Sequence, residues 1–354
     1  MFSFGSQSRV LTPARHGTER GVTQVTFEEM VRAHRRELLL HCYRLLGSLT
    51  DAEDVLQETL LAAWHGLDGF AGRSSVRTWL YRIATRRCLN ALRERGRRIP
   101  PAPTPPFSPP PPSRHGDTTW LQPFPDVLLE HLPDTTPGPE AHYSAREAIE
   151  LAFIAALQRL PTRQAAVLVL CDVLGYPLSE AAAMLQTTPT ATKGLLQRAR
   201  AAVARHRADH TSPDRGQAPA PGSARERALA DRFAEAFTAD DIDAVIALLT
   251  DDAWLAMPPA PHEYHGTAAI ADFLRASTAW RQGAGLGIRL RAIRANGQPA
   301  YLCHHPDNDT TEQPAGLIVL TLTGDRISGI TRFLDNHLQH HIEHLIADPN
   351  PADA

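Results

Sequence analysis

The placement of proline limits most what this chain can fold into. The chain has 354 residues and 29 prolines, many of which crowd between Pro100 and Pro139. Four of them are consecutive, at residues 109–112. Proline fixes φ and lacks the backbone N–H, so this run excludes a helix or a central strand and favours an extended polyproline II conformation. The stretch is therefore predicted to be a semi-rigid linker between folded parts.

A second polar segment that is rich in proline and glycine, residues 210–223, marks another break. The first 26 residues are polar and lack the apolar stretch of a signal peptide, so we expect a disordered tail there. A chain of this length suits two or three domains. The breaks predict a tail at 1–26, a first body at 27–98, a linker at 99–139, a second body at 140–208, a linker at 209–223, a third body at 224–347 and a tail at 348–354.

The bulk composition excludes several classes of protein. The formal net charge is −3, so the chain as a whole does not look like a nucleic-acid binder, and the charge of each segment is the better guide. The four cysteines form no CxxC pair, which argues against a disulfide framework or a zinc finger and fits a reducing cytoplasm. We see no apolar run near the roughly 20 residues that a membrane helix needs, and we expect a cytoplasmic protein.

The first body is predicted to be entirely helical, with two helices of opposite charge. Residues 50–53 form a capping box that would begin an acidic helix, which favours a basic protein partner or else a solvated acidic face. A second helix is expected over residues 75–98, where eight arginines accompany one acid, Glu94. Trp79 and Tyr81 lie among the arginines, as single-stranded DNA binding requires, although Trp79 also fits a core position.

The second body is also predicted to be helical and to end in a helix-turn-helix. Residues 144–147 form a capping box, Pro161 suits the first turn of a helix, Ser179 would cap a short helix, and Thr188 with Pro189 would open the last one. Residues 181–208 hold five basic and no acidic side chains, which favours phosphate binding. The alternative is an ordinary solvated helix in a helical hairpin.

The third body has the pattern of an α+β domain. Helices are expected first, and a meander of strands follows, with Gly324 and Asp325 forming a hairpin turn. The expected helices cover 225–237 and 242–249, and the expected strands cover 287–294, 299–304, 317–322 and 326–334.

Two smaller features of the third body are candidate sites. Histidines at 337, 340, 341 and 344 share one helical face that could bind zinc, but the neighbouring apolar stripe favours an amphipathic terminal helix, and no metal or cofactor is predicted. Cys303 beside His304 could be redox-active, but a lone cysteine is more often a small buried hydrophobe.

Three segments resemble one known family in the expected order. DAEDVLQETLLAAW (51–64) and FAGRSSVRTWLYRIATRRCLNALRER (70–95) resemble region 2 of the sigma-70 family, and residues 160–203 resemble its region 4. The linker between them contains no region 3. The resemblance covers about residues 27–208 and identifies the chain as a suspected extracytoplasmic-function sigma factor, with all-α regions 2 and 4.

The resemblance implies roles for matching positions. The acidic helix would bind the β′ subunit of core RNA polymerase through Asp54, Gln57 and Glu58. Region 2 would open and hold the −10 promoter element through Phe70, Arg77, Trp79, Tyr81, Arg82, Arg86 and Asn90. Region 4 would read the −35 element through Thr188, Thr190, Lys193, Gln197, Arg198 and Arg200. Many relatives have Ser-Arg where this chain has Gly194 and Leu195, which removes one basic contact.

The third body resembles SnoaL-like domains, which are α+β cones. The matching residues are 251–259, 264–266 before a helix at 267–274, RANGQPA at 294–300, a closing strand at 327–333 and, in the linker, 120–123. In sigma factors with such an extension, the resemblance implies that the domain tunes activity by contacting the sigma regions. Relatives of the fold include isomerases, for which the candidate residues are Asp252, Tyr264, His265 and His304.

The sequence thus predicts a promoter-specificity factor that is not itself an enzyme. Its partners would be core RNA polymerase, through β and β′, and promoter DNA, and the sequence does not indicate whether an anti-sigma factor exists. One alternative is a bifunctional protein whose SnoaL-like domain binds or turns over a small hydrophobic ligand. The other is an ordinary helix-turn-helix repressor, which leaves the region 2 resemblance unexplained.

Overall fold

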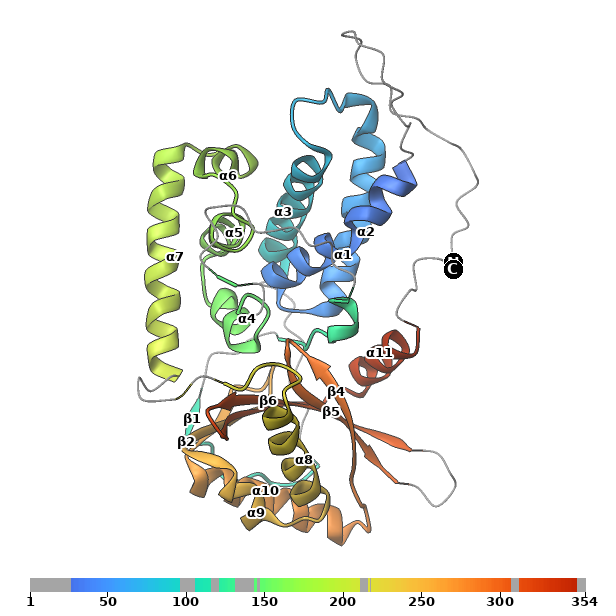
Figure 1. Cartoon of the computed structure of the whole chain (residues 1–354), viewed down its shortest axis with the longest axis vertical. Coiled ribbons are helices and arrows are strands. Elements are labelled where there is room, and N and C mark those ends of the chain that lie inside the picture. The colour runs from blue at the N-terminus through green and yellow to red at the C-terminus, as the bar shows by residue number, and fades with distance from the viewer. Residues whose placement is uncertain are drawn as a thin grey trace. The chain divides into compact units, whose positions relative to one another are not determined.

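The computed structural model describes residues 27–95, 106–115, 121–130, 143–144, 147–210, 216, 218–306 and 312–348. The predicted tail at 1–26, residues 349–354 of the other predicted tail, Trp120 and the side chain of Arg95 lie outside the described residues. The chain divides into two units, and most of their helices and strands are labelled in Figure 1. The first unit consists of Met1–Arg98, His131–Ser144 and Leu160–Ala201, and the second of Ile99–Glu130, Ala145–Arg159 and Ala202–Ala354.

The first unit is helical, as predicted. Its N-terminal part contains α1 (Phe27–Leu46), α2 (Leu49–Gly66), the 3₁₀ turn η1 (Leu67–Gly69) and α3 (Val76–Arg95). The three long helices pack on one another around fully buried side chains such as Leu38, Tyr43 and Leu56. The remaining elements are α5 (Thr162–Leu168), the π-helical turn η3 (Val169–Val173), α6 (Leu178–Met184) and most of α7 (Pro189–His210).

Thr188 caps α7 as predicted, but two helices of this unit begin elsewhere. The Thr188 hydroxyl accepts a hydrogen bond from the Ala191 N–H at 3.2 Å. The predicted cap at Thr50 is wrong, because Ser48 has the extended backbone of a cap and accepts from the Asp51 N–H. The predicted cap at Ser179 is also wrong, since α6 already begins after Pro177.

The capping box predicted at residues 144–147 is wrong for a tertiary reason. The helix of this segment, α4 (Leu151–Gln158), begins seven residues after Ser144 and has no side-chain cap at Glu150. The N–H of its first residue donates instead to the side chain of Gln298, 147 residues away in sequence, at 3.2 Å. A side chain of the α+β domain therefore satisfies the N–H that a local cap would have taken.

The second unit contains a seven-stranded sheet with the order β1-β3-β2-β7-β6-β5-β4. All neighbouring strands are antiparallel except β2 and β7, which are parallel. Residues 298–305 and 313–323 alternate little between buried and exposed positions, because their strands are covered on both faces. The strands are β1 (Arg114–His115), β2 (Leu249–Ala256), β3 (His262–His265), β4 (Arg289–Ala295), β5 (Gln298–His305), β6 (Gln313–Thr323) and β7 (Arg326–Phe333).

Helices pack on this sheet and complete its core. Side chains from α8 (Ala224–Thr238), α9 (Ile242–Ala247) and α10 (Thr267–Gly283) share one buried cluster with the strands, and these three helices gather on one side of the sheet in Figure 1. The terminal helix α11 (Asn336–Ala347) packs separately on β6. The predicted helices, the four predicted strands and the Gly324 turn are confirmed, whereas β1, β2 and β3 were not anticipated as strands.

Candidate nucleic-acid and polymerase interface

The last helix of the helix-turn-helix presents one polar face to solvent. Thr192, Leu196 and Ala199 lie on the opposite face of α7 and are buried. Pro189 at the first helical position and Thr188 before it set where the helix starts. The exposed side chains that were predicted to contact DNA are Thr188, Thr190, Lys193, Gln197 and Arg198.

Arg200, the sixth residue of that predicted set, is engaged inside the protein. Its guanidinium donates two hydrogen bonds to the Asp172 carboxylate, from Nε at 2.8 Å and from Nη2 at 2.7 Å. Asp172 is only 1% exposed and lies in η3, so the pair ties α7 to the preceding helices. The hydrogen bonds and the nearby carboxylate raise the pKa of Arg200. Arg200 therefore positions the helix.

Gly194, the departure from the family pattern, lies within α7 and is not required by crowding. A methyl group at this position would approach only the flexible end of Arg198, at 3.5 Å. That distance is an ordinary van der Waals contact. The glycine therefore lowers the stability of the helix without a packing reason in this structure.

Helix α3 carries an exposed polar row and a buried aromatic pair. Arg82, Arg86 and Asn90 are exposed and four residues apart, so they share one face. Trp79 and Tyr81 are 6% and 1% exposed, so the chain's own core covers the rings that were expected to stack on DNA bases. Phe70, from the loop before α3, is half-buried against Trp79, with ring centroids 4.9 Å apart.

Arg77, at the start of α3, is also half-buried and paired. Its Nε donates to the Glu37 carboxylate at 2.8 Å, and its guanidinium lies 4.8 Å from the centre of the Tyr81 ring. Burial raises the pKa of Glu37, but the hydrogen bond from His34 and the charge of Arg77 outweigh it and hold the pKa below its ordinary value. Tyr176, which follows η3, packs edge-on against Tyr81 at 6.0 Å. Region 4 residues thus touch this part of region 2 within the first unit.

A basic cleft of about 550 Å³ opens beside this contact. Its walls come from α2, α3 and the helices of region 4, and the described residues of these walls include no acidic side chain. Arg86 and Asn90 of the predicted −10 set line it. The polar and charged lining side chains are Arg86, Arg87, Asn90, Arg93, Arg163 and Gln186. Of the four guanidinium groups in this lining, Arg87 also pairs with Glu58 at 3.6 Å, so the cleft keeps an excess of positive charge that attracts a polyanion.

The predicted polymerase contact forms an exposed acidic patch on α2. Asp54, Gln57 and Glu58 are all exposed, and the opposite face of the helix is buried through residues such as Val55 and Leu56. Glu58 lies 3.6 Å from Arg87 in a solvent-exposed ion pair. Because such a pair contributes little stability, Glu58 can exchange it for a contact with a binding partner. The patch can therefore meet a basic protein surface without rearrangement of α2.

The α+β domain contains a polar cluster that sequence reasoning missed. The Asn296 side chain accepts from the Phe124 N–H and donates to the Ile149 carbonyl, both at 2.8 Å. It therefore holds the linker after its proline-rich part and the segment just before α4. Asn296 has a left-handed backbone, with φ at 58°, and forms the β4–β5 turn with Gly297. The signal was present in the RANGQPA motif, but the motif alone does not name partners far away in sequence.

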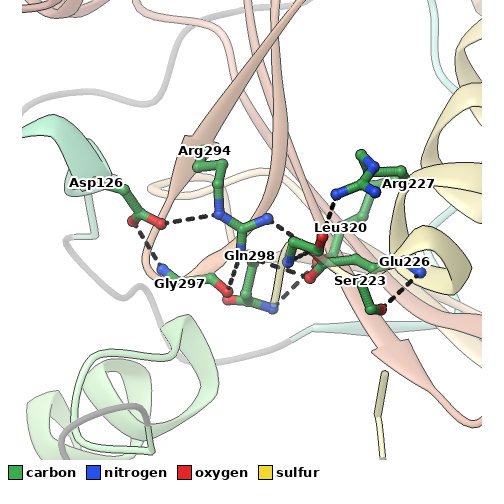
Figure 2. A network of polar contacts seen from close by, with 9 residues as sticks. Asp126, Ser223, Glu226, Arg227, Arg294, Gly297, Gln298 and Leu320 are labelled. Atoms are coloured by element: carbon green, nitrogen blue, oxygen red, sulfur yellow. Dashed lines mark hydrogen bonds and ion pairs between the residues drawn. The ribbon is translucent and has the colours of Figure 1, made fainter. Parts of the chain in front are cut away.

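Figure 2 shows how charged groups extend this cluster. Asp126 accepts from the Gly297 N–H at 2.8 Å and from Arg294 at 3.3 Å. Arg294 also donates to Glu226 of α8 at 2.7 Å. Burial raises the pKa of Asp126 despite these favourable contacts. The linker, the β4–β5 turn and α8 thus share one partly buried network.

The four residues considered for catalysis do not form one constellation. Asp252 is exposed, and the Tyr264 hydroxyl donates to the Pro110 carbonyl at 2.9 Å. His265 pairs with Glu263 at 2.9 Å. His304 is buried and meets Glu343 at 2.7 Å. Tyr264 and His304 have separate partners, and the structure does not bring them together as an acid–base pair.

Three further features concern metal ligands, Cys303 and membrane-spanning helices. Within it, no three His, Cys, Asp or Glu side chains are placed to hold a metal ion. Burial raises the pKa of the Cys303 thiol to about 11, so this cysteine is a poor nucleophile. No helix in the described ranges has the length and apolar character needed to cross a membrane.

Comparison with known families matches all three bodies. Sigma-70 region 2 matches residues 30–98, sigma-70 region 4 matches residues 150–203, and the SnoaL-like domain matches residues 230–330. The order of the three matches agrees with the expectation from the sequence.

Individual relatives agree with these matches. The extracytoplasmic-function RNA polymerase sigma factor SigG of Mycobacterium tuberculosis (strain CDC 1551 / Oshkosh) is 42% identical over 318 residues, covering 88% of this chain and 82% of SigG. SigJ of M. tuberculosis (strain ATCC 25618 / H37Rv) is 30% identical over 286 residues, covering 78% of this chain and 81% of SigJ. The crystal structure of M. tuberculosis SigJ has the same fold, with a TM-score of 0.57 at 20% identity over 88% of this chain and 96% of SigJ. The chain therefore belongs to the extracytoplasmic-function sigma factors, which bind core RNA polymerase and direct promoter-specific initiation, and it carries a SnoaL-like domain behind regions 2 and 4.

Proposed function

We propose that three exposed surfaces divide the work of promoter recognition in this sigma factor. The acidic patch on α2 binds the β′ subunit through Asp54, Gln57 and Glu58. The exposed row on α3 and the basic cleft bind the −10 element. The exposed face of α7 reads the −35 element. The exposure of these side chains supports the assignment.

For the −35 element, the side chains on α7 that contact DNA differ from the one that positions the helix. Thr188, Thr190 and Lys193 lie in the first turns, and the N-terminal part of a recognition helix is the part that meets base edges. Gln197 and Arg198 follow on the exposed face. Arg200 is assigned to positioning, because its guanidinium is committed to Asp172.

For the −10 element, we assign DNA contact to Arg82, Arg86 and Asn90. These side chains are exposed, and two of them line the basic cleft. Trp79 and Tyr81 are buried, so in the free protein they pack in the core and do not present their rings to DNA. Phe70 and Arg77 are half-buried, so they reach DNA only if the contacts with Trp79 and Glu37 loosen.

The SnoaL-like domain regulates the other two regions through the linker that joins them. The single observation that supports this regulatory role is a pair of hydrogen bonds made by the Asn296 side chain, one with Phe124 in the linker and one with Ile149 before α4. One amide holds both ends of residues 124–149, so it restrains the chain between regions 2 and 4. Such a restraint opposes the separation of two DNA-binding regions that read different promoter elements.

Run-off transcription with core polymerase tests the proposal in the full chain. Asn296→Ala should raise the transcript level about threefold or more, because the linker loses its restraint. Gln313→Ala is the matched control, since Gln313 is an exposed amide at the start of β6. A chain that ends near residue 208 extends the test to the whole domain. Unchanged output from both Asn296→Ala and the shortened chain would refute regulation by this domain.

The other candidate function is a bifunctional protein whose SnoaL-like domain binds or turns over a small hydrophobic ligand, and it can be tested with the full chain. The Tyr264 hydroxyl is occupied by the chain's own Pro110 carbonyl, which supports a binding role over turnover. Conversion of a polyketide-like or steroid-like compound by the full chain, abolished by Tyr264→Phe, would favour an enzyme instead.

A further inference from the structure

The proline-rich linker segment lies against an aromatic cluster of the SnoaL-like domain. Phe107 contacts Phe273 of α10 at 5.6 Å between ring centroids and stacks on Trp280 at 6.4 Å, with 28° between the two planes. It is half-buried and packs on the domain's buried core. Phe107 thus contributes an aromatic anchor to the domain near the start of the described segment 106–115.

The next contact fixes the backbone of the proline run. Tyr264 is fully buried, and its ring lies 4.7 Å from that of Phe273. Its hydroxyl donates to the Pro110 carbonyl at 2.9 Å. A buried phenol needs a hydrogen-bond partner, and the third residue after Phe107 supplies it. The aromatic rings therefore contact Phe107 while the Tyr264 hydroxyl binds the Pro110 carbonyl, so both residues are recognised by one site.

The end of the segment joins the sheet. The His265 N–H donates to the Ser113 hydroxyl at 3.1 Å. Arg114 and His115 then form β1, which pairs antiparallel with β3 opposite Glu263 and His262. Without this short strand, β3 would be the edge of the sheet, with unpaired backbone groups.

These contacts combine two ways in which domains bind peptides. Aromatic grooves take proline-rich segments whose conformation is already restricted, and exposed sheet edges take extended strands. Both modes occur here within nine residues, 107–115. Four consecutive prolines lower the conformational entropy that docking must remove, so binding is favoured even for a short segment.

We propose that Tyr264, Phe273, Trp280 and the edge of β3 form a peptide-binding site whose occupant is the chain's own segment 107–115. The site recognises an aromatic residue, a proline carbonyl three positions later and an extended pair at the end. The segment leaves this site when the protein binds core polymerase and the linker extends between regions 2 and 4. The release step rests on the proposed regulatory function, whereas the docking does not.

A disulfide across β1 and β3 tests both parts in the full chain. His115 and His262 are directly opposite in the register, and their rings are 5.6 Å apart. Cross-strand neighbours have the spacing that a disulfide needs. The four native cysteines are buried, so background cross-linking is low. The test variant is His115→Cys with His262→Cys, and the control is Ser108→Cys with His262→Cys, because residue 108 is exposed and out of register.

Under oxidised glutathione, the test pair should cross-link at least tenfold faster than the control pair. The oxidised protein should give run-off transcripts reduced about fivefold or more, and dithiothreitol should restore them. Equal cross-linking rates would overturn the docking site. Rapid cross-linking with equal transcription in both redox states would overturn the release step alone. Inactivity of the reduced protein would instead count against the proposed sigma surfaces.

A second measurement needs no cross-link. Arg114 is a trypsin site that the pairing of β1 protects. Phe107→Ala should speed cleavage after Arg114 about tenfold, whereas Ser108→Ala, at an exposed neighbour, should leave the rate unchanged. Mass spectrometry of timed digests reports the rate. An unchanged rate in Phe107→Ala would show that the aromatic anchor does not hold the segment.

Discussion

Arg200 donates two parallel hydrogen bonds to Asp172, a carboxylate with only 1% of its surface exposed. The bidentate geometry fixes the direction of α7 relative to η3. The pair therefore connects the helix that faces DNA to the helices that carry it. Two arginines only two residues apart on α7 therefore differ in their surroundings: the Arg198 side chain is exposed, whereas the Arg200 guanidinium is hydrogen-bonded to Asp172.

Arg200→Ala should weaken −35 binding by destabilising region 4. Removing one partner leaves a buried carboxylate, and we expect a loss of roughly 1–3 kcal/mol of unfolding free energy, reduced from the fully buried case because the Arg200 side chain is 41% exposed. Hydrogen exchange of α5 and α7 measures this loss. Arg198→Ala should weaken DNA binding with exchange unchanged. Equal exchange in the two variants would contradict the positioning role.

Gly194→Ala should stabilise α7. Alanine favours the helix by up to about 1 kcal/mol over glycine, and the added methyl group meets only ordinary contacts. Amide exchange across residues 189–203 should slow by about threefold to fivefold. Slower exchange with unchanged promoter preference would show that the glycine does not serve sequence readout. A destabilised Gly194→Ala protein would contradict the open environment of this position.

Gly329→Ala should destabilise the SnoaL-like domain. Gly329 pairs with Trp254 across β2 and β7, and a methyl group would lie 2.4 Å from atoms of the indole ring. Overpacking of this kind costs about 1–3 kcal/mol. Denaturant unfolding of the full chain, followed by exchange of β2 and β7 peptides, measures the effect. Gly283→Ala is the matched control, because nothing lies within 4 Å of its added methyl. Equal stabilities would refute the steric argument.

Region 2 should lose stability as the pH falls below about 6.5. Burial, with smaller effects from the charges of Arg44 and Arg77, lowers the pKa of His41 to about 3. The unfolded chain takes up a proton near the ordinary value of 6.5 while the folded chain does not. Stability is therefore lost as the pH falls between about 6.5 and 3, by about 2 kcal/mol at pH 5.

The His41 prediction is checked by hydrogen exchange of α1 and α3 at pH 7.5 and pH 5.0, corrected for intrinsic rates. His41→Met removes the titrating group and should reduce the pH dependence of these peptides. The hydrogen bond between His41 and Thr85 is also lost, so the variant is compared with Thr85→Val, which retains the histidine. Equal pH dependence in His41→Met and the parent chain would exclude His41 as the cause.

Local patterns in the sequence were enough to predict much of the fold. Thr188 and Pro189 mark the start of α7 because a capping hydroxyl and a fixed φ act within one turn. Apolar runs predicted β4 to β7, and Gly324 marked their last hairpin. The acids near the start of the helix and its apolar spacing indicated that α2 has one acidic and one buried face. Each of these depends on interactions among residues that are close in the sequence.

The tertiary structure decided the features that depend on distant partners. Periodicity could not tell that Trp79 and Tyr81 are covered, because a basic helix with aromatics suits either a core or a DNA surface. Composition predicted a linker at 99–139, yet parts of it dock on the α+β domain. Asn296 and Phe124 are 172 residues apart, and no local preference encodes their hydrogen bond. The sequence by itself determined most of the helices and the strands β4 to β7, since those preferences act within a few residues, whereas β1, β2 and β3 form only where their pairing partners meet in the sheet. Packing alone decided which polar groups meet, because a buried donor takes whichever acceptor the folded chain brings within reach.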